Sequence, residues 1–249
     1  GAGSKRRWLM VDCGVSFADD SLPGVDVVMP NVGVLEAQRR NLVGIVVTHA
    51  HEDHIGALLD LWPRLQVPVY ATPFAAALLA AKAAGEGAPE IPVTVVEQGA
   101  RWSLPPFDLE FVAVSHSIPE PNALVVRTPL GTVVHSGDWK IDATPGVGRP
   151  IDLARFAEIG AEGVRAFVCD STNAVREGRS PSEADVAASL AEIIARAPAR
   201  VAVTTFASNL ARLRAVMLAA KAAQREVVVM GRAMQRVLDV AADLGYLDG

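Results

Sequence analysis

The segment HAHEDH at residues 49–54 constrains this chain more than any other part of its sequence. An apolar run at residues 44–48 precedes it, and the run IGALL at residues 55–59 follows as the first turns of a helix. Histidines two positions apart at a strand end project to one side, while the Asp-His pair on the next turn can reach a second point nearby. The segment therefore predicts a strand, loop and helix that gather ligands for two metal ions.

The residue types in this segment are those that zinc prefers. Imidazole nitrogen and carboxylate oxygen bind zinc at about 2.0–2.2 Å, and a single tetrahedral ion uses only four ligands. The chain has five histidines, and His49, His51 and His54 all fall within these six positions beside Asp53. A purely structural role is the alternative, but isolated surface or core histidines do not explain such clustering.

Three further residues fall where a site at strand ends would place them. His116 follows a predicted strand over residues 109–115, and its alternative role is to cap that strand. Asp138 follows a glycine that permits close backbone approach, so its carboxylate can lie between two ions; an Asx turn is the alternative. For His135, in an alternating apolar strand, we favour packing or hydrogen bonding beneath the site.

Short β-rich runs alternate with alanine-rich helical stretches, which predicts an α/β fold. The predicted strands cover residues 8–12, 44–48, 67–70, 109–115, 125–128 and 132–135. The sequence TPLG at residues 128–131 places proline and glycine in β-turn positions. The last two of these strands should therefore form a hairpin.

The pattern of predicted helices and strands changes after a polar stretch at residues 170–180. Ser180, Pro181 and Glu183 predict a helix start near Pro181, as N-cap, first-turn proline and capping-box glutamate. Beyond it the pattern predicts strands over residues 200–204 and 226–230 and helices over residues 210–223 and 234–244. We place a domain boundary near residue 180.

Composition limits the class of protein. With 249 residues, 51% of them hydrophobic, the chain can bury a large core. Its longest apolar runs end well before the roughly 20 residues that a membrane span requires. Cys13 and Cys169 have no zinc-finger or redox spacing and no signal-peptide pattern opens the chain, which fits a reducing cytoplasm. The net charge of −5 argues mildly against a nucleic-acid partner.

The pattern His-x-His-x-Asp-His after an apolar strand resembles the signature of the metallo-β-lactamase superfamily, and His116 and Asp138 follow in the order of its later ligand motifs. The resemblance implies an αββα sandwich with two zinc ions, in which Asp53, His54 and Asp138 are catalytic. It assigns His49, His51 and His116 to one ion, and Asp53 and His54 to the second. It places Asp138 as the bridge between the two ions.

Narrower motifs resemble the ribonuclease J family of β-CASP nucleases. They are VDCG at residues 11–14, HSIP at 116–119, RTPLG at 127–131, HSGDWK at 135–140, DSTN at 170–173 and TFASN at 205–209. The resemblance implies a metallo-β-lactamase domain over residues 1–180 and the start of an inserted β-CASP α/β domain over residues 181–249. It also implies RNA as substrate, phosphodiester hydrolysis from the 5′ end or internally, and a homo-oligomer for the full-length protein.

The same resemblance suggests roles for residues outside the ligand set. Ser208, Asn209 and Lys140 are candidate phosphate contacts, although each is equally well explained as a surface or loop residue. Asp12 and Asp170 are candidates for orienting the ligating imidazoles.

This sequence also departs from the family pattern. Ala211 stands where many relatives have histidine, which puts one substrate contact in doubt. The family's first strand and last metal-binding histidine are expected outside these residues, so the isolated piece could be inactive. The alternatives are a DNA-processing β-CASP nuclease, a small-molecule hydrolase with the same metals, and a binding protein that keeps the fold without activity.

Overall fold

The computed structural model describes residues 6–247 of the chain. The first part contains β1 (Trp8–Val11), β2 (Ser16–Phe17), β3 (Val27–Val28), α1 (Gly33–Ala37), the 3-10 helix η1 (Arg39–Asn41), β4 (Leu42–Val46), α2 (Glu52–Ile55), α3 (Leu58–Leu65), β5 (Val69–Ala71), α4 (Pro73–Glu86) and β6 (Val93–Val95). The second part contains β7 (Arg101–Leu104), β8 (Phe107–Ala113), β9 (Asn122–Thr128), β10 (Gly131–His135), α5 (Leu153–Glu162), β11 (Ala166–Val168), α6 (Glu183–Arg196), α7 (Leu210–Ala222) and α8 (Arg232–Asp243).

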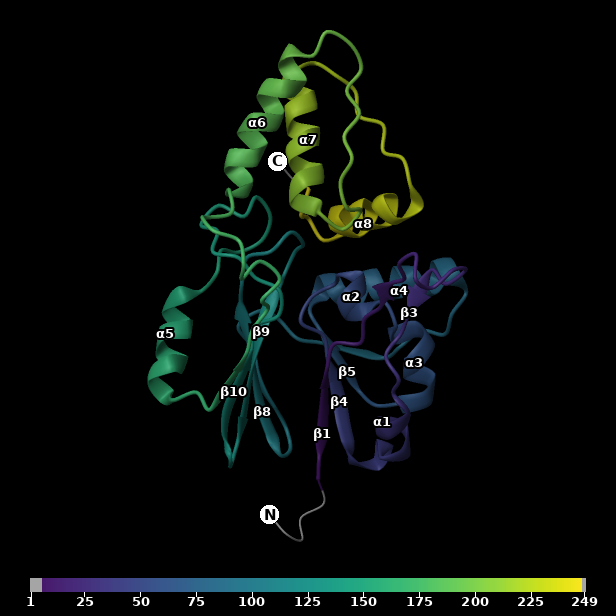
Figure 1. Cartoon of the computed structure of the whole chain (residues 1–249), viewed down its shortest axis with the longest axis vertical. Helices are drawn as coiled ribbons and strands as arrows, with labels where there is room; N and C mark the ends of the chain where they lie inside the picture. Colours follow the sequence, from purple (N-terminus) through teal and green to yellow (C-terminus); the bar gives the residue numbers. More distant parts are fainter. Residues whose placement is uncertain (1–5, 248–249) are drawn as a thin grey trace.

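A four-stranded parallel sheet organises the first part, in the order β1-β4-β5-β6. Its crossovers run through helices, which Figure 1 shows on the side of this sheet that faces away from the second sheet. Leu58, Leu65, Phe74 and Leu78 belong to the core cluster that joins helices α3 and α4 to this sheet. Because all its strands are parallel, their carboxyl ends meet at one edge, where the HAHEDH segment follows β4.

A five-stranded sheet forms the second layer, in the order β11-β10-β9-β8-β7. The predicted hairpin is confirmed: β9 and β10 pair antiparallel, and Gly131 lies opposite Thr128 across the turn. Ile159 and Phe156 of α5 pack against the outer face of this sheet. Val46 of the first sheet packs with Leu109, Phe111 and Leu124 of the second, so the two sheets share a core. The architecture is the αββα sandwich that the sequence predicted.

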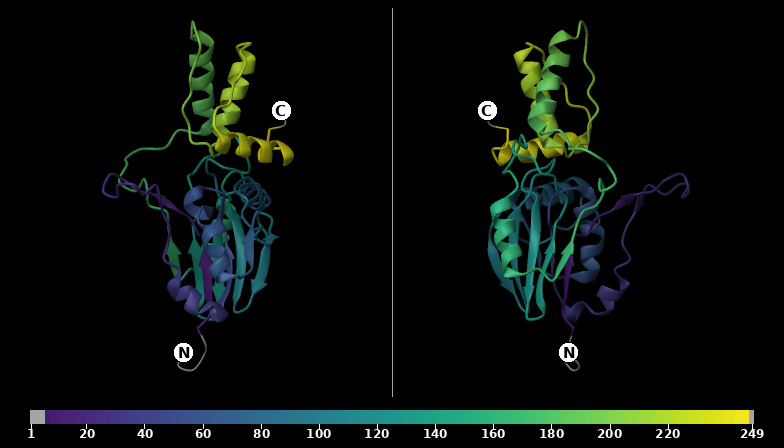
Figure 2. Two further views of the ribbon diagram at one scale, coloured as in Figure 1. Left: turned by 90° about the vertical axis from the view of Figure 1, so that its right-hand side faces the viewer. Right: turned by 60° about the vertical axis from the view of Figure 1, so that its left-hand side comes forward.

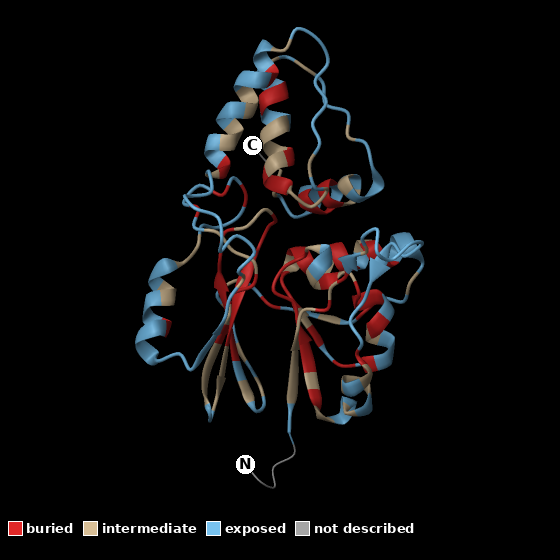
Figure 3. Cartoon of the chain, viewed as in Figure 1, coloured by how far each residue is buried: buried red, intermediate tan, exposed pale blue. Residues whose placement is uncertain are grey.

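Helices α6, α7 and α8 stand beyond one end of the sandwich, with α8 close to α4 (Figures 1 and 2). Val237, Val240 and Ala241 of α8 belong to the same core cluster as α4, which shows that α8 is packed onto the sandwich. In Figure 3 the segments between the helices of this part are mostly exposed, whereas α7 is mostly buried or intermediate. The domain boundary near residue 180 stays a prediction.

The predicted strands over residues 200–204 and 226–230 are wrong: in the described structure, neither segment belongs to a β-ladder. Their β-branched residues favour extended backbone, but a strand also requires a neighbouring strand to accept and donate its hydrogen bonds. Val201, Val203 and Val228 are exposed instead. Together with α6, α7 and α8, the two segments line a cavity of about 910 Å³.

The predicted start of the helix near Pro181 is correct in place but wrong in its caps. Ser182, not Ser180, is the N-cap of α6, and Asp185 rather than Glu183 closes the capping box. The side chain of Glu183 is occupied elsewhere, because its Oε1 accepts a hydrogen bond from Lys140 Nζ at 2.9 Å.

The helix predicted directly after HAHEDH is divided into α2 and α3. The backbone N–H groups of Cys13 and Val15 donate to the carbonyl oxygens of His54 and Glu52, and Ala57 N–H donates to Cys13 O. The helix is interrupted because this neighbouring segment takes up hydrogen-bonding groups that a continuous helix would use. Among the helices that the structure describes, none is long and apolar enough to span a bilayer.

Candidate metal centre

The HAHEDH segment leaves β4 at the carboxyl edge of the parallel sheet and enters α2. His49 lies just beyond the end of this strand and is 1% exposed, whereas His51 is the N-cap of α2. Asp53 and His54 lie on the four-residue α2 itself. Local structure thus separates the segment into an extended half and a helical half, as the sequence predicted.

The structure brings His49, His51, His116 and Asp138 together, with one ligand atom of each within 4.8 Å of all the others. His51 Nδ1 lies 3.1 Å from His49 Nε2 and 3.0 Å from His116 Nε2. Ligands at about 2 Å from a tetrahedral ion are separated by slightly more than 3 Å, so these nitrogens fit around one divalent ion.

A second group of donors comprises Asp53, His54 and Asp138. His54 Nε2 lies 3.6 Å from Asp53 Oδ2 and 3.3 Å from Asp138 Oδ1. The other oxygen of Asp138, Oδ2, lies 3.7 Å from His116 Nε2. Asp138 is therefore the residue shared by both groups, with one carboxylate oxygen turned toward each.

Burial keeps the first group of imidazoles neutral, which is the state that binds a metal ion. Burial and the neighbouring imidazoles lower the pKa of His49 well below its ordinary value. The same causes lower the pKa of His51 to about 3, and burial also lowers the pKa of His116. The hydrogen bond to His54 lowers the pKa of Asp138, so this carboxylate is ionised.

His54 differs from the other imidazoles because two carboxylates surround it. Burial opposes its protonation, but hydrogen bonds to Asp12 and Asp138 raise its pKa to about 10. Without a metal ion, His54 therefore carries a proton between the two aspartates at neutral pH.

Asp12 supports this arrangement from the end of β1. Its Oδ2 accepts hydrogen bonds from His54 Nδ1 at 2.7 Å and from Thr48 Oγ1 at 2.8 Å. Its Oδ1 accepts a further hydrogen bond from Thr48 N–H at 2.7 Å. Asp12 thereby aims Nε2 of His54 at the second group, and Thr48 is a supporting residue that the sequence analysis did not identify.

The other candidate for orienting an imidazole, Asp170, lies differently. Its Oδ1 accepts hydrogen bonds from Thr172 N–H and Oγ1, and its own N–H donates to Ser136 Oγ. Its charge opposes the lowering of the pKa of His116, but among the described residues no imidazole bonds to its carboxylate. His135 accepts a hydrogen bond from Gly137 N–H at Nδ1, beside the site.

Two glycines permit the close packing of this centre. A Cβ on Gly14 would lie 1.7 Å from the carbonyl oxygen of Asp53, so only glycine lets the segment after β1 approach α2. Gly137 has a φ of +58°, and its Cβ would lie 2.5 Å from Asn122 O. Close approach at Gly137 was predicted from the sequence, and the signal for Gly14 was its place two residues after Asp12.

Two of the three candidate phosphate contacts are already engaged. Lys140 Nζ lies 3.0 Å from Asp142 Oδ2 and 2.9 Å from Glu183 Oε1, so two carboxylates surround its charge. Asn209 is the N-cap of α7, where its Oδ1 accepts a hydrogen bond from Arg212 N–H. Their role toward substrate stays a prediction.

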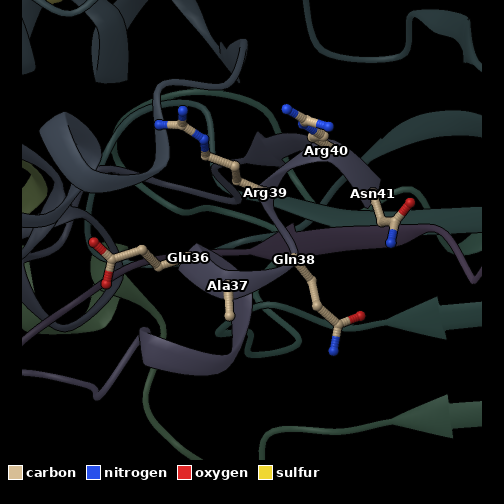
Figure 4. A pocket seen from close by; sticks show the side chains of 6 residues that line it. All are labelled: Glu36, Ala37, Gln38, Arg39, Arg40 and Asn41. Carbon is tan, nitrogen blue, oxygen red and sulfur yellow. The ribbon is translucent and has the colours of Figure 1, made fainter.

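A second pocket lies away from the metal donors. Residues 36–41 line a polar pocket of about 460 Å³ that includes Arg39 and Arg40 (Figure 4). These residues precede β4, whereas the HAHEDH segment follows it, so the two lie at opposite ends of the strand.

Two family models match this chain. A family model described as "Beta-lactamase superfamily domain" matches residues 7–205, and one described as "Ribonuclease J, beta-CASP domain" matches residues 198–249. A protein named Ribonuclease J from Sinorhizobium meliloti is 59% identical over 100% of this chain and 44% of its own length. Another from Corynebacterium glutamicum is 45% identical over 97% of this chain and 34% of its own.

The chain thus spans less than half the length of these relatives. Among solved structures, a protein of unknown function from Enterococcus faecalis V583 is similar, with a TM-score of 0.58 and 16% identity. The match covers 87% of this chain and 58% of that one. At this identity, the likeness concerns the fold alone.

Proposed function

This chain belongs to the metallo-β-lactamase superfamily and, within it, to the ribonuclease J family; from that premise we propose that it supplies the metal-binding core of an RNA phosphodiester hydrolase. The observation that carries the proposal is the convergence of four donors in one group and three in another around the shared Asp138. The fold and this cluster support a divalent metal. That the full-length protein binds two zinc ions is part of the proposal.

The donor set fits that assignment chemically. His49, His51 and His116 offer neutral nitrogens, which zinc favours, and Asp53 and His54 offer a carboxylate and an imidazole. Divalent ions in such a site make a water nucleophilic at neutral pH and stabilise charge on the oxygens of a phosphoryl group.

The residues of the chain orient the metal ligands and provide contacts for the phosphate of a substrate. Asp12 holds the Nδ1 proton of His54, so Nε2 of that ring is the atom presented to the site. Asp138 spans the two groups and fixes their separation. Ser208 and Asn209 precede α7, and the positive end of the helix dipole at this N-terminus favours a phosphate. Lys140 could contact phosphate only by leaving its carboxylate partners.

RNA is favoured over other substrates by the family match in the last part of the chain. A small-molecule hydrolase would use the same metal donors but would not require residues 198–249 to resemble a β-CASP domain. A DNA-processing β-CASP nuclease is the nearer alternative, because phosphate contacts do not distinguish the two nucleic acids.

The decisive experiment uses the full-length protein loaded with zinc. It is incubated with 5′-monophosphate RNA and with DNA of the same sequence, each labelled at one end in separate samples. We expect RNA to be cleaved and DNA to remain intact, and the labelled products to distinguish attack from the 5′ end from internal cleavage. Cleavage of DNA alone, or no cleavage by protein with two bound ions, would overturn the proposal.

Assembly and location are part of the same proposal. We expect the full-length protein to be a homo-oligomer, which light scattering would measure directly. We also expect it in the cytoplasm, which fractionation of the source cells would test.

A further inference from the structure

Lys82 is a buried cation within an apolar helical stripe. The core-facing residues of α4 are Phe74, Ala75, Leu78, Leu79, Lys82 and Ala83. The side chain of Lys82 is 9% exposed, and its Nζ donates a hydrogen bond to Glu52 Oε2 at 2.6 Å. Glu52 is the residue between His51 and Asp53 in the HAHEDH segment, and neither the sequence motif nor the donor groups gave it a role.

Stability does not explain a lysine at this position. A buried ammonium must give up its hydration, and an apolar side chain of similar volume often stabilises a core equally well or better. Glu52 is 47% exposed, so the pair gains less than two fully buried charges would. The ion pair is better explained by what it holds in place.

The held element is α2, which has only four residues. So short a helix has no stable orientation of its own, so contacts with other elements must fix it. Two of these contacts are backbone hydrogen bonds from Cys13 and Val15 on one side. The ion pair between Glu52 and Lys82 ties α2 to α4 on another.

Gly56, at the end of α2, lies against both the backbone and the side chain of Glu52. A Cβ on Gly56 would lie 2.8 Å from Glu52 Oε2 and 2.4 Å from Glu52 O. Its φ of −59° is an ordinary helical value, so the glycine is not required by backbone conformation. The absence of a side chain there permits the close approach of the Glu52 carbonyl and of Val15 Cγ2, also 2.8 Å away, and leaves space for the Glu52 carboxylate that pairs with Lys82.

We propose that Lys82 is a positioning residue of the metal centre: through its ion pair with Glu52, it fixes the orientation of the short helix that presents Asp53 and His54. This inference rests on the proposed function, since it takes those two residues as ligands. It predicts that the loss of Lys82 weakens metal binding at the group of Asp53, His54 and Asp138 and spares the three-histidine group.

The test measures zinc affinity in the full-length protein by competition with a chromophoric chelator. Lys82→Met should weaken binding of the second zinc equivalent by about tenfold to a hundredfold, the range for residues that orient metal ligands, and leave the first unchanged. Glu52→Gln should also lower the affinity for the second zinc equivalent, and Lys82→Arg should keep most of that affinity. Circular dichroism checks the fold, and Glu52→Gln keeps the test valid if Lys82→Met does not fold.

The matched control is Glu86→Gln. Glu86 lies one turn farther along α4 and pairs with Arg236 of α8 at 3.7 Å, so its loss removes an ion pair from the same helix without touching α2. Equal losses in Glu86→Gln and Lys82→Met would overturn the inference, as would an unchanged second affinity in Lys82→Met. A wild-type protein that binds no zinc would overturn the proposed function as well.

Discussion

His54 donates a hydrogen bond to Asp12, with 2.7 Å between Nδ1 and Oδ2, across 42 positions of the sequence. The bond joins the end of β1 to α2, and β1 also pairs parallel with β4, the strand that precedes α2. It places the Nδ1 proton of the imidazole on the side away from Asp53 and Asp138. The Nε2 atom of His54 is therefore the one available to a metal ion.

Asp12→Asn should lower the affinity of the second zinc equivalent by about tenfold to a hundredfold, because the neutral amide orients His54 less strongly. Zinc titration of the full-length protein measures this effect. Asp60→Asn, which changes an exposed carboxylate on α3, is the control and should bind zinc normally. A normal second affinity in Asp12→Asn would show that this hydrogen bond does not support the metal centre.

Asp53→Ala and His54→Ala should each abolish hydrolysis while leaving the fold and part of the RNA affinity. Both side chains belong to the second donor group, and the Asp53 side chain is 63% exposed, so its loss removes little packing. Turnover on labelled RNA, with metal content and circular dichroism measured in parallel, checks the outcome. Asp108→Ala, an exposed residue of β8, is the control. Near wild-type turnover with zinc present would exclude the two-metal site.

Replacing Ser208 by Ala and Asn209 by Ser should weaken RNA binding and cleavage several-fold without loss of zinc. Serine at position 209 keeps an oxygen that can cap α7 in place of Asn209 Oδ1, so a loss of helix stability does not confuse the result. The deficit should be similar for RNAs of different sequence, because a phosphate contact reads no base.

The control for this double variant is Ser103→Ala, at an exposed position of β7. Unchanged RNA cleavage by the double variant would leave the loop as ordinary structure. An equal loss on a small ester substrate would favour a generic hydrolase.

Glu110→Gln should destabilise the sandwich in a pH-dependent way. Burial opposes ionisation of Glu110, but hydrogen bonds from Arg155 and Arg127 lower its pKa in the folded state. The ionised carboxylate therefore stabilises the fold above the pKa of the unfolded chain, and this contribution is lost as the pH falls through the lower, folded value. We expect Glu110→Gln to lower the unfolding free energy by about 1.5–3 kcal/mol at neutral pH.

Urea unfolding at pH 7, 4 and 3 checks this expectation, since the difference between wild type and Glu110→Gln should shrink at the acid end. Glu158→Gln removes an exposed partner of Arg155 and should cost about 1 kcal/mol or less. A difference that grows on acidification would contradict the assigned direction of the shift.

Local sequence determined several of the helices and strands. Apolar residues before HAHEDH, the TPLG turn and the alanine-rich runs each depend on neighbours a few positions away, so strands β4, β9 and β10 and helix α7 were predicted within a few residues. Helix breaks and strand pairing depend on distant partners. The division of α2 from α3 and the unpaired segments over residues 200–204 and 226–230 could not be read from the sequence for that reason.

Four of the candidate metal ligands follow from sequence alone, because His49, His51, Asp53 and His54 lie in one short segment with the chemistry of zinc ligands. How His116 and Asp138 join them depends on the packing of the whole fold, since two sheets must pack before residues this far apart in the chain can come within 4.8 Å. The same packing set the pKa values, because burial and neighbouring charge are properties of the folded site. It also brought Lys82 to Glu52, a contact between two helices that no local pattern encodes.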